Sequence, residues 1–100
     1  MSRMDKLSTY ATKIKKSEAE TIITYHRTDI VRFDADLIAL KFGGYDTATT
    51  RKKMNQAAAQ FYLPYSVHRK AGETFITSRI SGEVIQYNGQ DTITIQRKGA

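Results

Sequence analysis

Residues 43–55 constrain the fold more than any other part of the chain. The segment GGYDTATTRKKMN joins two adjacent glycines to helix-capping residues and a run of cations. Gly43 and Gly44 are expected to end the preceding strand, because adjacent glycines accept backbone angles that strain other residues. Asp46 or Thr47 can then act as the N-cap, since its side-chain oxygen accepts an amide hydrogen from the first helical turn. The segment therefore predicts a strand, a turn and a helix start in succession.

The predicted helix is amphipathic. At 100° per residue its apolar side chains fall on one stripe, made of Met54, Ala57, Ala58 and Phe61. The stripe expected to face away consists of Lys52, Asn55, Gln56 and Ala59. Pro64 lacks an amide hydrogen and disfavours helical geometry just before it, so the helix is predicted to end near Phe61 or Tyr62. This pattern is typical of a helix laid on a sheet.

Alternating, β-branched segments predict strands on both sides of the helix. Before it, strands are expected over residues 20–26, 29–33 and 37–42, with a turn at Asp34-Ala35-Asp36. In the second of these, Val31 and Phe33 are expected to point one way, and Ile30 and Arg32 the other. After the helix, residues 65–70 and 73–78 flank Ala71-Gly72, and residues 83–87 and 91–96 flank Asn88-Gly89. Both pairs are predicted to be hairpins, the second with a type I′ turn.

The first 16 residues leave two readings open. Met4, Leu7, Ala11 and Ile14 could form one helical stripe, whereas residues 12–16 could be a short edge strand. We interpret residues 1–16 as a partly ordered basic arm that ends in a strand, and residues 17–97 as a single domain. The predicted fold class is α+β: a mostly antiparallel, curved sheet with one central amphipathic helix between strand 3 and strand 4, because the loops are too short for parallel crossovers.

Charge is the main functional signal. The 100-residue chain carries a formal charge of +6, and five cations against one acidic residue leave +4 of it in residues 1–16. Cysteine is absent, which rules out disulfides and fits a reducing cytoplasm. No signal-peptide core and no run of about 18 apolar residues occurs, so a soluble protein with no membrane partner is expected.

Catalytic and metal-binding patterns are weak. Asp34 and Asp36 could hold a magnesium ion, but paired carboxylates are also ordinary turn chemistry. His26 and His68 are the two histidines of the chain and make a poor zinc site without cysteine. No nucleophile is paired with a base, so neither an enzyme nor a cofactor is expected.

The order of features resembles a group of small bacteriophage-encoded proteins of unassigned role. The resemblance covers roughly residues 10 to 95 and rests on YHRTDIV at residues 25–31, on GGYDTATTRKKMN, on Phe61 and on the Tyr65-Ser66-Val67 strand. It implies a phage origin, and with it a place in the cytoplasm of the infected bacterial host. It transfers no catalytic or binding residue to this chain.

Two binding roles follow from the sequence. The first is an accessory protein that binds a nucleic-acid backbone through the basic arm and the helix start, where amide hydrogens, the helix dipole and cations favour phosphate. Asn55 and Gln56 would add base contacts, and a mixture of aromatic and cationic residues that includes Tyr25, His26 and Arg27 would suit single-stranded bases. The alternative is a protein-binding inhibitor or modulator of a host enzyme or anti-phage defence component. The oligomeric state stays open, with a dimer among the possibilities. The candidate phosphate-binding or nucleic-acid-binding residues are Thr47, Thr49, Thr50, Arg51, Lys52, Asn55, Lys13, Lys15 and Lys16.

Overall fold

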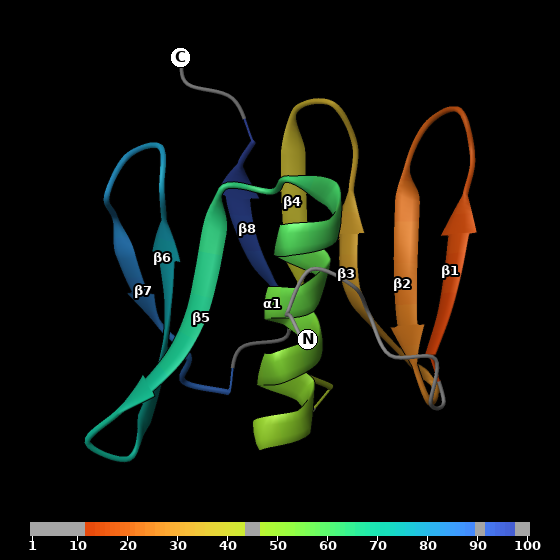
Figure 1. Cartoon of the computed structure of the whole chain (residues 1–100). Coiled ribbons are helices and arrows are strands. Elements are labelled where there is room, and N and C mark those ends of the chain that lie inside the picture. The colour runs from red at the N-terminus through yellow and green to blue at the C-terminus, as the bar shows by residue number, and fades with distance from the viewer. Residues whose placement is uncertain (1–11, 44–46, 90–91, 98–100) are drawn as a thin grey trace, which may run out of the picture.

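In the part of the chain that the structure describes, two antiparallel sheets and a single helix share one hydrophobic core (Figure 1). The computed structural model describes residues 12–43, 47–89 and 92–97. In chain order, the described elements are β1 (Thr12–Lys16), β2 (Thr21–Tyr25), β3 (Thr28–Phe33), β4 (Leu37–Leu40), α1 (Ala48–Phe61), β5 (Tyr65–Lys70), β6 (Glu73–Ser78), β7 (Val84–Gln86) and β8 (Ile93–Gln96).

The larger sheet has the strand order β1-β2-β3-β4-β8, and the smaller has the order β5-β6-β7. Helix α1 lies in front of the larger sheet and packs on β3 and β5 (Figure 1). The α+β prediction therefore holds in outline, but strands expected in one curved sheet are divided between two. The buried side chains of both sheets and of α1, among them Ile38, Met54 and Ile76, form one cluster.

The helix follows the fourth strand, so its predicted place between strand 3 and strand 4 is wrong. The difference arises at residues 12–16, where the end of the basic arm forms a full edge strand. Each of these residues pairs with β2, from Thr12 opposite Tyr25 to Lys16 opposite Thr21. Lysines suit such a position, because charged side chains protect a sheet edge from further strand pairing. The rest of the arm lies outside the described residues.

The predicted hairpin at Asn88-Gly89 is also wrong. Gly89 does have a positive φ of 84°, but β7 pairs with β6 while β8 pairs with β4. Strand β8 continues the buried rows of the larger sheet, with Ile93 opposite Leu40 and Ile95 opposite Ile38. Burial of these isoleucines outweighs the local turn preference, since each fully buried isoleucine contributes about 1.5–3 kcal/mol. Ile93 and Ile95 are each 4% exposed.

A β-bulge corrects the prediction for Ile30. Along the β2–β3 pair, Ile23 lies opposite Val31 but Thr24 lies opposite Asp29, which leaves Ile30 as the extra residue. A bulge of this kind re-aims one side chain across the sheet. Ile30 was expected to point away with Arg32, yet it is 1% exposed and belongs to the core.

The ends of α1 agree with the sequence. Thr47 is the N-cap, and its side-chain oxygen accepts a hydrogen bond from the Thr50 amide. The helix ends at Phe61, where Tyr62 takes a left-handed conformation and its amide donates to the carbonyl of Ala58. The predicted N-cap at Asp46 or Thr47 and the predicted end near Phe61 or Tyr62 are confirmed.

Candidate functional site

A pocket of about 880 Å³ opens between the β2–β3 turn and the start of α1. Its described wall includes three apolar side chains, Tyr25, Ile30 and Phe42. Two cations, Lys13 and Arg27, also line it. None of the described lining residues is acidic. The pocket therefore combines an apolar surface with positive charge.

Local backbone features shape this pocket. The bulge in β3 turns Ile30 into its wall, and His26 occupies the tight β2–β3 turn with a φ of 58°. Thr28 follows this turn and lies against Gly43, where an added Cβ would sit 2.6 Å from Oγ1 of Thr28. Gly43 also has a φ of 63°, so the chain after β4 requires glycine for both space and backbone angle.

Tyr25 is the centre of the aromatic wall. Its ring lies 4.3 Å from the ring of His26, between centroids, and Nζ of Lys53 lies 5.0 Å from the Tyr25 centroid. Lys53 is only 3% exposed. Burial lowers the pKa of Lys53, and the neighbouring charge of Lys52 lowers it further. A buried ammonium beside Tyr25 adds to the positive potential behind the pocket.

The start of α1 supplies fewer free groups than the sequence suggests. The Thr50 amide donates to Oγ1 of Thr47 at 3.2 Å, the Thr47 hydroxyl donates to Oγ1 of Thr50 at 3.1 Å, and Thr50 is 1% exposed. Thr49 is exposed, and Lys52 also reaches solvent. An anion at this helix start would therefore be held mainly by positive charge and the helix dipole, with little help from the Thr50 hydroxyl.

Asn55 belongs to the internal structure of the protein. Its Nδ2 donates to the carbonyl of Val67 at 2.7 Å, and its Oδ1 accepts from the amide of Val67 at 2.8 Å. Gln56 is buried as well, at 7% exposure. The prediction that these two side chains face solvent is wrong, because that side of α1 is covered by β5. An asparagine inside a helix was the available signal, since asparagine is a poor helix former and needs a compensating bond.

The three lysines of β1 do not act as one group. Lys13 lines the pocket, whereas Lys15 lies two residues further along the strand, opposite Ile22. Lys16 lies at the other end of α1, with its Nζ 5.4 Å from the ring centroid of Phe61. The structure thus brings only Lys13 to the helix start.

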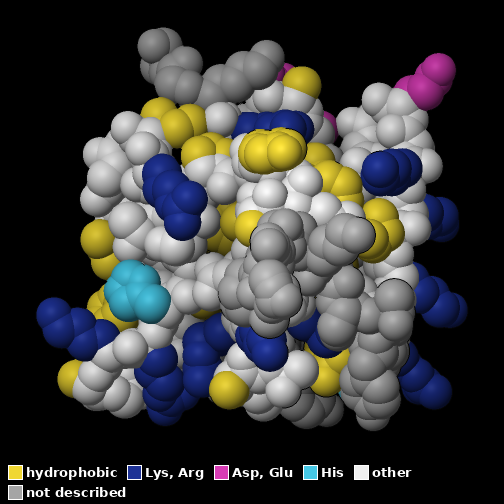
Figure 2. Space-filling view, in the orientation of Figure 1, with side chains coloured by type: hydrophobic (Ala, Val, Ile, Leu, Met, Phe, Trp, Pro, Cys, Tyr) yellow, Lys and Arg dark blue, Asp and Glu magenta, His cyan; other side chains and the backbone are white. Residues whose placement is uncertain are grey.

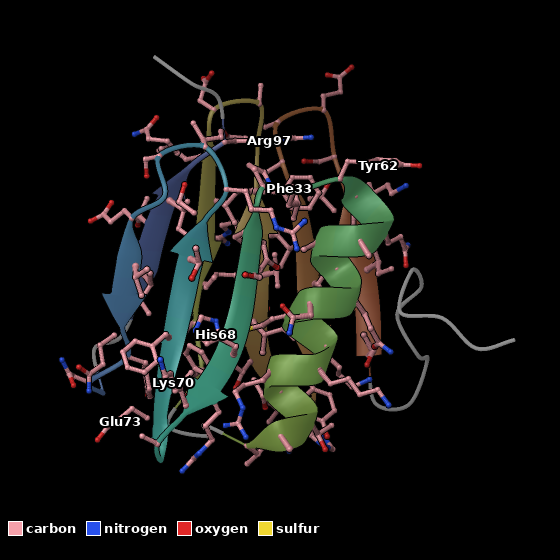
Figure 3. The ribbon with its side chains drawn as sticks, turned by 60° about the vertical axis from the view of Figure 1, so that its left-hand side comes forward. Phe33, Tyr62, His68, Lys70, Glu73 and Arg97 are labelled. Carbon is pink, nitrogen blue, oxygen red and sulfur yellow. The ribbon has the colours of Figure 1, made fainter. Side chains whose placement is uncertain are left out.

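Arg27, Arg69 and Lys70 are not among the phosphate-binding residues expected from the sequence, although they belong to the mixture of aromatic and cationic residues that would suit single-stranded bases. Arg27 comes from the β2–β3 turn, whose residues line the pocket. The Asn55–Val67 bonds hold α1 against the middle of β5, and the two elements run in opposite directions, so β5 ends toward the same end of the molecule as the helix start, although its last residues diverge from α1 (Figure 1). Figure 3 shows His68 and Lys70 on this end of β5. We call the resulting surface the basic end; it comprises Lys13, Arg27, Arg51, Lys52, Arg69 and Lys70.

Acidic side chains lie mainly toward one end of the molecule. In Figure 2, Lys and Arg side chains appear over both the upper and the lower half of the visible face, while Asp and Glu appear only near the top. The two described acidic residues nearest the basic end are engaged: Asp29 accepts from Oγ1 of Thr24 at 2.7 Å, and Glu73 accepts from Nε2 of Gln86 at 2.8 Å. Five other described acidic residues lie in or beside the turns at the opposite end, namely Glu18, Glu20, Asp34, Asp36 and Glu83.

The described residues contain neither a candidate metal site nor a candidate membrane-spanning helix. Among residues 12–43, 47–89 and 92–97, no three His, Cys, Asp or Glu side chains gather in a group that could hold a metal ion. No helix in this part of the chain combines the length and the hydropathy that a bilayer span needs.

The fold and surface define a small α+β protein of two antiparallel sheets with a strongly basic end. Comparison with protein families identifies it as a phage protein, which confirms the resemblance found in the sequence. The model described as Kyanoviridae Gp96 protein matches residues 1–95, so the chain belongs to this family. No curated protein and no solved structure matches the chain.

Proposed function

We propose that this phage protein is an accessory binding protein that holds a nucleic-acid backbone at its basic end. The observation that carries the proposal is that cations of three separate segments, the β1–β3 corner, the start of α1 and the end of β5, lie toward one end of the molecule. Two of them, Lys13 and Arg27, line the pocket there. Phosphates of nucleic acids are the abundant polyanion of an infected cell, and lysine and arginine that neutralise them release condensed counterions. The role requires neither catalysis nor a cofactor, and it places the protein in the host cytoplasm.

Backbone contact fits this surface better than base reading by the helix. Of the two residues of α1 suited to adenine, Gln56 is buried and Asn55 is half-buried with both of its polar groups bonded to Val67, so neither is placed to read a base in a groove. Arg51 and Lys52 instead lie at the helix start, where the positive end of the dipole adds to their charge. The contacts expected from this arrangement position a backbone and carry little sequence information.

A salt-dependent titration tests the proposal. Labelled single-stranded DNA, duplex DNA and RNA are titrated with the protein at about 50 and about 200 mM salt. Binding that weakens steeply with salt is expected, because each neutralised phosphate contributes about −0.9 to the slope of log K against log salt on duplex DNA. Absence of binding to all three polymers at the lower salt would refute the proposal.

Single charge removals locate the surface. Arg27→Ala and Lys52→Ala are each expected to lower affinity and to flatten the salt slope by about one. Arg79→Ala is the matched control, since Arg79 is an exposed cation beside the β6–β7 turn at the opposite end. Equal losses in all three variants would show that net charge, rather than the basic end, governs binding.

A second candidate role is docking on a host protein. Exposed apolar side chains at the end opposite the basic end favour this role. There Tyr62 is 90% exposed, and Ile80 is also exposed. The amide of Arg79 donates to the carbonyl of Pro64, which holds the two apolar side chains on neighbouring segments. Capture from an infected lysate after nuclease treatment tests this role: one stoichiometric protein that is lost with Tyr62→Ser supports it, and loss of every partner after nuclease contradicts it.

A further inference from the structure

We propose that the pocket beside the β2–β3 turn holds one unpaired base of a single-stranded nucleic acid, with the adjoining phosphate at Lys13 and Arg27. This inference rests on the proposed function and names its substrate class. It predicts that the protein distinguishes single-stranded from duplex nucleic acid, which contact with the backbone alone would not do.

The volume and the wall of the pocket favour a ligand with a flat apolar part. About 880 Å³ is enough for a nucleotide, since small-molecule pockets typically measure about 300 to 1,000 Å³. A site for phosphate alone would be lined by polar groups, whereas here Tyr25, Ile30 and Phe42 supply an apolar wall. The absence of acidic side chains among the described lining residues favours a ligand that is also an anion.

The aromatic residues are placed for stacking. His26 is exposed, and its ring adjoins Tyr25 at a centroid distance of 4.3 Å. Every nucleobase has a π-face, so two neighbouring aromatic rings accept any base. The hydroxyl of Thr28 on the same wall can hydrogen-bond to the edge of the base.

The backbone of the turn gives an independent argument for His26. It is the first residue of a two-residue hairpin turn and has a φ of 58°, a position where glycine, asparagine or aspartate is preferred. The chain therefore keeps an imidazole where the backbone favours a different residue. Departures of this kind from local preference are expected at functional positions.

The pocket can accept a base of a single-stranded nucleic acid more readily than a base of a duplex. A base inside a duplex is stacked on both faces and paired along its edge, and extruding it costs a few kcal/mol. An unpaired base enters the pocket without that cost, while the flanking phosphates reach the cations of the rim. The pocket thus predicts a preference for single-stranded over duplex nucleic acid.

The test compares four ligands on the intact protein: an oligothymidine, a strand of equal length and charge that lacks bases, a duplex of equal length, and free thymidine monophosphate. Oligothymidine is expected to bind about tenfold more tightly than the strand without bases, as one stacked base implies. His26→Asn, which suits the positive φ of the turn, is expected to remove most of that preference and to leave binding of the baseless strand unchanged. The matched control is His68→Asn, since His68 is exposed on β5 and does not line the pocket.

The outcomes separate this inference from the proposed function. Equal binding of oligothymidine, baseless strand and duplex would overturn the base pocket but leave backbone binding intact. Free thymidine monophosphate that binds as tightly as the strand would assign the pocket to a small nucleotide and would also overturn the inference. Failure of every polymer to bind at low salt would refute both proposals.

Discussion

Asn55→Ala is expected to destabilise the protein without altering its charge. Both side-chain groups of Asn55 pair with the backbone of Val67, at 2.7 and 2.8 Å, so the substitution leaves an amide and a carbonyl of β5 without these partners. Each unsatisfied, partly buried group costs about 1–3 kcal/mol. The better helix propensity of alanine returns about 0.5 kcal/mol. For the two groups together, a net loss of about 1.5–5.5 kcal/mol is expected, a large share of the roughly 5–15 kcal/mol typical of a folded domain.

The assay is urea unfolding followed by circular dichroism, together with thermal unfolding. A loss of this size lowers the midpoint by at least about 6 °C, at about 4–8 °C per kcal/mol for a domain of this size. Asn55→Asp is an informative intermediate, because a carboxylate keeps the acceptor for the Val67 amide but loses the donor to its carbonyl. Lys52→Ala on the same helix is the control and is expected to change stability by less than about 0.5 kcal/mol.

One result would refute this reasoning. If Asn55→Ala kept the stability of the natural sequence but bound nucleic acid more weakly, Asn55 would be a ligand contact and its bonds to Val67 would contribute little. If stability falls and the folded variant keeps the same salt slope, the assignment of Asn55 to the internal structure is confirmed.

Three further predictions concern stability. Gly43→Ala is expected to lower the free energy of unfolding in urea by about 2–4 kcal/mol, because the new Cβ meets Thr28 and the φ of 63° is strained for alanine. Gly82→Ala is the control and is expected to cost less, because the space around its Cβ is open. Equal losses in the two variants would contradict the clash with Thr28. The backbone amides that bond to Asp34 hold its pKa below the usual value of 3.8, so its ionised form stabilises the fold above about pH 4 and this contribution is lost as the pH falls through the lowered pKa. Asp34→Asn is therefore expected to unfold with a weaker acid dependence between about pH 2 and 4, and an unchanged profile would contradict this. Tyr65→Phe removes a buried hydroxyl that donates to a helix carbonyl at 2.6 Å, and a loss of about 1–2 kcal/mol in urea unfolding is expected, whereas no loss would show that the bond contributes nothing.

Local elements of this fold could be predicted because local chemistry decides them. The Thr47 cap, the end of α1 and the Ala71-Gly72 turn depend on residues within one or two turns of chain, and all three are confirmed. The hairpin expected at Asn88-Gly89 failed, because β8 finds its partner in β4, more than 50 residues earlier. The turn preference of two neighbouring residues contains no information about a distant strand edge that offers a larger buried surface.

The candidate site was predicted in part for the same reason. Lys52 and the helix start follow from the amphipathic pattern and the cap. Asn55 was misread because its partner, Val67, lies on an element whose position relative to α1 is set by the whole core. Arg27 reaches the site through the bulge and turn geometry of the β2–β3 pair, which alternation alone does not encode.

The pairing of β8 with β4 also has a consequence for synthesis on the ribosome. The larger sheet is incomplete until residues 93–96 have emerged, so the growing chain exposes the hydrogen-bonding edge of β4 while everything before it can already fold. A vacant edge of this kind accepts the same strand from another nascent copy.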